Sequence, residues 1–189
     1  MAMVANGPGP KLAGRAVDVA KEYLGMGMDG LVSVGFCGGL DPALQVCDIF
    51  VAGEVVGFAA PAIPVFTARR HRTGRLLSVD RVVTSAAERR GLHAAGADAV
   101  EMEVAAIAER ASQWGVSFYA VRVVTDTAEE SFRLDFNSVR DAAGRLSRAR
   151  ILAAAARRPA ALLPELMKLN KRSKSAAKAL GDFLADARF

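Results

Sequence analysis

The chain has 189 residues, 52% of them hydrophobic, and a formal net charge of +5 at pH 7. This length suits one domain of ordinary size, and the apolar content is sufficient for a buried core, which excludes an intrinsically disordered chain. No apolar run approaches the ~20 residues of a membrane-spanning helix, and the N-terminus lacks a secretory signal pattern, so we expect a cytoplasmic protein.

The positive charge is concentrated near the C-terminus. Residues 145–178 contain ten lysine or arginine residues and one acid, Glu165, so the remainder of the chain is net negative. The basicity therefore belongs to a C-terminal segment, and we expect no nucleic-acid partner for the rest of the chain. Cys37 and Cys47 have no zinc spacing and no matching histidine pair, so we expect neither a metal site nor a disulfide framework.

Helix and strand signals alternate along the first half of the chain. The spacing of apolar residues predicts a helix over residues 11–24 and then a short buried strand over 31–34, which ends at a glycine-rich loop. Further strands are expected over 49–52 and 54–58. A long loop is expected over 59–75, a length typical of functional or mobile segments.

The second half of the chain continues the alternation. We expect, in chain order, strand material at 76–79 and 81–83, a helix over 86–95, a helix that begins after 99–100, a buried strand over 116–124, and helix from 140 to 189 with breaks at Pro159 and Pro164. This pattern predicts an α/β sandwich of the three-layer type with a mixed, mostly parallel central sheet. We place a core domain at 1–140 and a basic helical C-terminal extension, packed on or near it, at 141–189.

Two segments rich in glycine or acidic residues follow strand-like runs. In an open α/β sheet, ligands collect beyond the carboxyl ends of parallel strands. The first segment is 34–40, and the second couples 100–103 to 122–126. Taken singly, these residues have ordinary explanations, since Asp126 could cap a following helix and Glu103 could be a favourable acid at a helix start.

The residues of both segments resemble the purine nucleoside phosphorylase and methylthioadenosine/adenosylhomocysteine nucleosidase superfamily. Three motifs carry the resemblance, in the family's order: Gly35-Phe36-Cys37-Gly38-Gly39-Leu40 followed by Val46-Cys47-Asp48-Ile49-Phe50-Val51, then Val100-Glu101-Met102-Glu103-Val104-Ala105-Ala106-Ile107-Ala108, then Arg122-Val123-Val124-Thr125-Asp126. They are similar to the family's glycine loop and "GD-I/V-V-V" strand, its nucleoside-binding helix start, and its "R-x-I-S/T-D" strand end. Within the superfamily, residues 78–83 and 158–164 are most similar to the hopanoid-associated phosphorylases.

The resemblance implies a nucleoside phosphorylase-like fold and an enzyme that cleaves the N-glycosidic bond of an adenine nucleoside. The specific expectation is phosphorolysis of adenosylhopane to adenine and a ribosyl product in hopanoid biosynthesis, with phosphate as co-substrate and no cofactor. The implied partners are a small-molecule or lipid-linked adenine nucleoside and a second copy of the chain in a homo-oligomer. Two alternatives stay open: hydrolysis by a methylthioadenosine/adenosylhomocysteine nucleosidase, and a non-catalytic membrane- or nucleic-acid-binding protein.

The resemblance also implies roles for individual residues. Asp126 would be the catalytic general acid at the base, protonated because burial disfavours a charged carboxylate. Glu103 would bind the ribose hydroxyls, and Thr125 would orient Asp126. The other residues expected at the substrate are Met102, packed against the ribose, and Glu101, Cys37, Gly38 and Phe36.

The chain departs from the family pattern at two places. Relatives begin with a strand ahead of the segment that matches residues 7–10, so we expect a core that lacks this strand. Phe36 stands where relatives often have Ser or Thr, which leaves the choice between hydrolysis and phosphorolysis open and suggests a pocket for an apolar 5′-substituent. In the C-terminal segment, leucines mixed with lysines and arginines would either lie on the inner membrane as a peripheral contact or pack on the domain.

Overall fold

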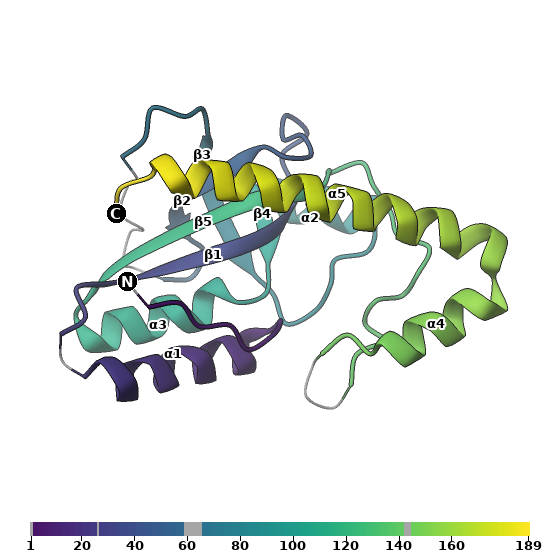
Figure 1. Ribbon diagram of the computed structural model, residues 1–189. Helices are drawn as coiled ribbons and strands as arrows, with labels where there is room; N and C mark the ends of the chain where they lie inside the picture. Colours follow the sequence, from purple (N-terminus) through teal and green to yellow (C-terminus); the bar gives the residue numbers. More distant parts are fainter. Residues whose placement is uncertain (1, 26, 59–65, 142–144) are drawn as a thin grey trace.

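The computed structural model describes residues 2–25, 27–58, 66–141 and 145–189 (Figure 1). The elements in chain order are α1 (Pro10–Leu24), β1 (Gly30–Gly39), β2 (Ile49–Val55), β3 (Arg72–Ser78), α2 (Ala86–Ala94), β4 (Ala99–Glu101), α3 (Val104–Trp114), β5 (Ser117–Asp126), α4 (Arg148–Arg157) and α5 (Pro159–Asp186). Three strands, β1 to β3, follow α1 directly, strands and helices then alternate from α2 to β5, and the chain ends in two helices.

The strands form one mixed sheet whose pairing closes on itself in the order β1-β4-β3-β2-β5. β1 runs parallel to β5, and β3 runs parallel to both β2 and β4, whereas β1 is antiparallel to β4 and β2 is antiparallel to β5. The predicted α/β fold with a mixed, mostly parallel sheet is confirmed.

Helices cover the sheet on two sides. Figure 1 shows α1 and α3 next to each other below the strands and α5 along the opposite side. β5 is buried from both sides, because Phe118 and Ala120 belong to the apolar cluster that includes residues of α1 and α3, while Val121 and Val123 pack against α5. Strand residues alternate between the two faces, so a strand buried on both faces is apolar at successive positions.

The long C-terminal helix packs on the sheet through a stripe of apolar residues. Ala176, Leu180 and Phe183 of α5 are buried against β2 and β5. The predicted break at Pro159 is confirmed, because α4 ends at Arg157 and α5 begins with this proline, which suits a first helical position. The predicted break at Pro164 is wrong, since α5 continues through it. Among the described helices, none is both long and apolar enough to cross a membrane.

Several strand boundaries differ from the prediction. β1 does not stop at residue 34 but continues through Gly39, because β5 and then β4 hydrogen-bond to its glycine-rich half. β3 begins at Arg72, inside the expected loop, because β2 pairs with residues 72–76, while β4 pairs only with residues 76–78. Residues 81–83 are not a strand, and β2 ends at Val55 instead of continuing as a second strand to residue 58. Residues 59–65 of the expected loop lie outside the described residues.

Candidate active site

The three motif segments meet at the carboxyl end of β1. Asp126, the last residue of β5, is in register with Gly38, and Gly38 is in turn in register with Val100 of β4. Neighbouring strands lie about 5 Å apart, so Asp126 and Val100 are separated by about 10 Å with β1 between them. Glu101 ends β4, and residues 102 and 103 connect it to α3. The structure therefore brings together the acidic motif (residues 100–103), the glycine segment (residues 34–40) and the end of β5.

A buried ion pair crosses β1 from β5 to β4. Arg122 Nη2 lies 2.7 Å from Glu101 Oε2, and both side chains are 1% exposed. The guanidinium also donates to the carbonyl oxygen and the hydroxyl oxygen of Ser33, each at 2.8 Å. The side chain of Arg122 on β5 thus links the end of β4 to β1.

Glu101 holds the beginning of α3 in place. Its carboxylate accepts hydrogen bonds from the Ser78 hydroxyl and from the backbone N–H groups of Glu103 and Val104, at 2.9 and 3.0 Å for the two amides. Burial alone would raise the pKa of Glu101, but Arg122, the hydroxyl and the amide outweigh it, and the pKa is lowered. Since protein donors surround this carboxylate, its observed contacts are structural, and its contact with substrate stays a prediction.

Glu103 lies at the junction of two helices. It is the N-cap residue of α3, and its Oε1 accepts a 2.7 Å hydrogen bond from the backbone N–H of Gly9, the N-cap residue of α1. The pKa of Glu103 is raised, first because burial removes water from the carboxylate and second because Glu101 is close. The buried face of α3 begins at the next residue, Val104, and continues with Ala108 and Ala111.

Both oxygens of the Asp126 carboxylate have partners. The Thr125 hydroxyl donates to Oδ1 at 2.7 Å and also lies 3.3 Å from the carbonyl oxygen of Cys37. Arg89 Nη2 lies 2.5 Å from Oδ2. A guanidinium from α2 therefore reaches this buried acid, whereas the sequence indicated its burial alone. The side chain of Asp126 is 13% exposed, so a ligand can still contact it.

Arg89 is the residue at this site that the sequence prediction missed. It is 1% exposed, donates to the carbonyl oxygen of Val83 at 2.9 Å, and has its guanidinium 5.5 Å from the centre of the Phe132 ring. Arg89 lies three residues before Leu92, which also faces the interior. Helical periodicity therefore gives a weak signal that Arg89 is buried. The neighbouring Arg90 has a 59% exposed side chain, and composition alone does not distinguish the two.

The absence of a side chain at Gly38 leaves space for the pair formed by Arg89 and Asp126. A Cβ atom at Gly38 would lie 2.7 Å from both Arg89 Nη1 and Asp126 Oδ2, so only glycine fits without moving them. Cys37 is buried, and burial raises the pKa of its thiol. Phe36 is 45% exposed and, because strand residues alternate, faces the opposite side of β1 from Cys37. Met102 is partly exposed at the turn between β4 and α3.

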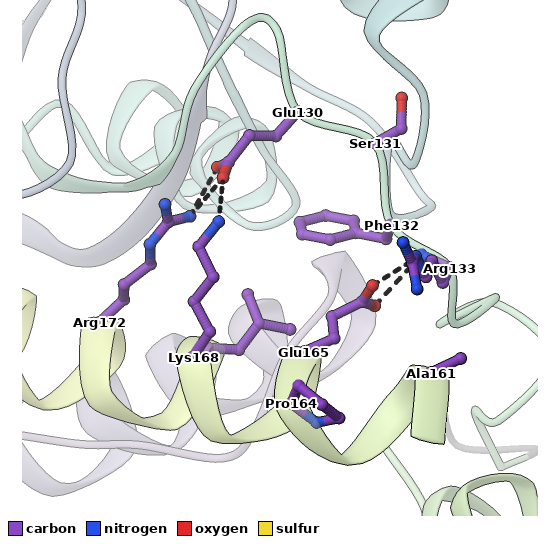
Figure 2. A pocket seen from close by; sticks show the side chains of 10 residues that line it. Glu130, Ser131, Phe132, Arg133, Ala161, Pro164, Glu165, Lys168 and Arg172 are labelled. Carbon is purple, nitrogen blue, oxygen red and sulfur yellow. Dashed lines mark hydrogen bonds and ion pairs between the residues drawn. The ribbon is translucent and has the colours of Figure 1, made fainter. Parts of the chain in front are cut away.

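A separate cleft of about 400 Å³ lies between α5 and residues 130–133. In Figure 2, Glu130 faces Arg172 and Lys168 of α5, while Glu165 of the same helix accepts hydrogen bonds from the backbone N–H of Arg133. The lining residues do not include the predicted site residues. This cleft is nevertheless next to the site, because its wall residue Phe132 covers the guanidinium of Arg89.

Comparisons with known proteins identify similar sequences and folds. A family model described as the phosphorylase superfamily matches residues 59–157. A 5′-methylthioadenosine/S-adenosylhomocysteine nucleosidase from Anoxybacillus flavithermus (strain DSM 21510 / WK1) is 31% identical over 142 residues, which cover 57% of this chain and 60% of the relative. The chain thus spans about three fifths of the length of this curated relative.

Solved structures of similar proteins share the fold. The 5′-methylthioadenosine/S-adenosylhomocysteine nucleosidase from Neisseria meningitidis, in complex with methylthio-immucillin-A, has a TM-score of 0.62 and 22% identity over 96% of this chain and 77% of that one. Futalosine hydrolase of Helicobacter pylori strain 26695 has a TM-score of 0.62 and 18% identity over 96% of this chain and 76% of that one. At this level of identity the similarity establishes the fold.

Proposed function

This chain belongs to the phosphorylase superfamily, and from that premise we propose that it cleaves the N-glycosidic bond of a nucleoside whose base is adenine. The similar proteins named as methylthioadenosine/adenosylhomocysteine nucleosidases support this reaction class. They also favour water as the nucleophile. The motif resemblance of residues 78–83 and 158–164 supports the narrower alternative, phosphorolysis of adenosylhopane.

The observation that carries the proposal is the constrained but accessible carboxylate of Asp126. Thr125 and Arg89 hold its two oxygens, and its side chain remains partly exposed beside the glycine segment. When the bond between the anomeric carbon and the base breaks, the electron pair moves to the base, which requires a proton. Asp126 supplies this proton as general acid.

Glu103 acts on the sugar in this proposal. Its carboxylate would accept hydrogen bonds from the 2′- and 3′-hydroxyls of the ribose, and its negative charge would stabilise the positive charge that develops at the anomeric carbon. The backbone N–H of Gly9 donates to one of its oxygens, Oε1. Since Glu103 follows Val100 closely and Asp126 is about 10 Å from Val100, one nucleoside could contact both carboxylates.

The test is adenine release from methylthioadenosine, adenosine and a lipid-linked adenosine, each with and without phosphate. We expect Asp126→Asn to lower kcat/KM by about 10²- to 10⁴-fold, the usual contribution of one positioned proton donor. Asp182→Asn, at a 48% exposed side chain on α5, is the matched control and should retain wild-type activity. Failure of the wild type to release adenine from any substrate, or full activity of Asp126→Asn, would contradict the proposal.

The panel also separates the finer alternatives. A requirement for phosphate indicates phosphorolysis, and turnover without phosphate indicates hydrolysis. A preference for the lipid-linked nucleoside over methylthioadenosine would support adenosylhopane as the substrate. Phe36 is 45% exposed and therefore accessible, and its contact with an apolar 5′-substituent stays a prediction.

We further propose a peripheral membrane contact through α5 and association of the chain with a second copy. Met167 and Leu163 of α5 are 72% and 49% exposed, and Lys168 and Lys171 are close to them in sequence, a mixture that suits an anionic lipid surface. Co-sedimentation with anionic vesicles should weaken in Met167→Glu, and equal binding by wild type and variant would refute the membrane contact. Light scattering that gives the mass of a single chain would refute the association.

A further inference from the structure

We propose that Arg89 is a positioning residue for cleavage of the bond to the base, acting through Asp126. Its guanidinium fixes the direction of the Asp126 carboxyl group and takes up the negative charge left there after proton transfer. This inference rests on the proposed function and adds to it a residue that lies outside the three motifs.

The guanidinium of Arg89 has further contacts besides its ion pair with Asp126. The guanidinium donates to Val83 on the segment before α2, lies 3.4 Å from the carbonyl oxygen of Gly39 at the end of β1, and is covered by the ring of Phe132. Contacts from three segments therefore fix the position of the guanidinium independently of Asp126. A charged group fixed in this way can impose an orientation on a neighbouring carboxylate.

Arg89 and Thr125 together determine the plane of the Asp126 carboxyl group. Arg89 contacts Oδ2 and the Thr125 hydroxyl contacts Oδ1, and Arg89 Nη1 and Asp126 Oδ2 both lie where a Cβ atom at Gly38 would clash with them. Removal of the guanidinium would leave Oδ2 of Asp126 without this partner. The carboxyl group could then rotate. Removal of Arg90, whose partner Glu129 is itself 68% exposed, would change nothing at Asp126.

The chemical step gives Arg89 a role that depends on the leaving group. The bond from the anomeric carbon to the base breaks, its electron pair moves to the base, and the Asp126 carboxyl group, protonated from solvent, transfers its proton to a base nitrogen. Water, which releases one proton to solvent, or phosphate forms the new bond to the anomeric carbon. Asp126 ends this step as a carboxylate, which the guanidinium stabilises. A leaving group that departs as a stable anion needs no proton and should not need Arg89.

The test compares adenosine with p-nitrophenyl riboside, whose nitrophenolate leaves without protonation. We expect Arg89→Met to lower kcat for adenosine by about 100-fold or more while changing kcat for the nitrophenyl substrate by less than about threefold. Arg89→Lys, which keeps a charge near Asp126, should recover part of the adenosine activity. Arg90→Met is the control and should match the wild type on both substrates.

A double variant identifies the route of the effect. If Arg89 acts through Asp126, Arg89→Met combined with Asp126→Asn should be no slower on adenosine than Asp126→Asn alone. If Arg89→Met does not fold, Arg89→Lys makes the same comparison, with at least a tenfold difference expected between the two substrates. Equal loss on both substrates, or full activity on adenosine, overturns the inference. Failure of the wild type to release adenine instead refutes the proposed function, so the two failures are distinguishable.

Discussion

Replacing Arg122 by methionine would leave the Glu101 carboxylate buried without its counter-charge. Methionine fills much of the space of the aliphatic part of arginine but makes none of its hydrogen bonds. The substitution therefore tests whether the ion pair that crosses β1 stabilises the fold.

The burial of both partners determines the expected magnitude. Both side chains are 1% exposed and their nearest atoms are 2.7 Å apart, and removing one partner of such a pair typically costs about 3–5 kcal/mol. Glu101 would keep the Ser78 hydroxyl and two backbone N–H donors, so we expect the lower end of that range, about 3 kcal/mol. In a chain of this size such a loss lowers Tm by roughly 6–12 °C.

The assay is urea denaturation at pH 7 together with a thermal scan. Arg75→Met is the matched control, because Arg75 also pairs with a glutamate, Glu54, at 3.0 Å, but the two side chains are 44% and 47% exposed. An exposed pair of this kind contributes about 0–1 kcal/mol. Adding Glu101→Gln to Arg122→Met removes the unpaired charge and should recover at least about 1 kcal/mol.

Acid should weaken this pair in the wild type. The pKa of Glu101 is lowered in the folded state, so its contribution to stability is present above the unfolded-state pKa of about 4.3 and is lost as the pH falls through the folded-state value. Arg122→Met should reduce this dependence on acid. The reasoning is refuted if Arg122→Met costs no more than Arg75→Met, or if Glu101→Gln recovers nothing.

Two further predictions concern stability near the site. Cys47 has a φ of 74°, in the left-handed region that favours glycine, so Cys47→Gly should raise the free energy of unfolding by up to about 1 kcal/mol in urea titrations; a loss of stability would show that packing of the thiol outweighs backbone strain. The pKa of Glu103 is raised in the fold, so its unfavourable contribution increases as the pH rises from the unfolded-state value through the folded-state value. Glu103→Gln should therefore be more stable than the wild type at pH 7, with the difference vanishing below about pH 4, and a difference independent of pH would contradict this.

Local periodicity predicted some elements well. The helix expected over 11–24 is α1, Pro10–Leu24, and the strand expected over 116–124 is β5, Ser117–Asp126, because an amphipathic helix and a strand buried on both faces have distinct patterns. The second half of β3 falls within the strand expected at 76–79, but its first half, residues 72–75, could not be predicted, because it is polar and basic and becomes a strand through pairing with β2.

The amino-acid sequence by itself determined the family, the α/β class and the candidate acids, because motif residues and their spacing are local properties of the chain. Only the tertiary structure decided that Asp126 pairs with Arg89 and Glu101 with Arg122. Each pair joins side chains from different elements, and their distances depend on strand register and helix packing, which no short segment encodes. The electrostatic surroundings of both acids are therefore a property of the assembled sheet.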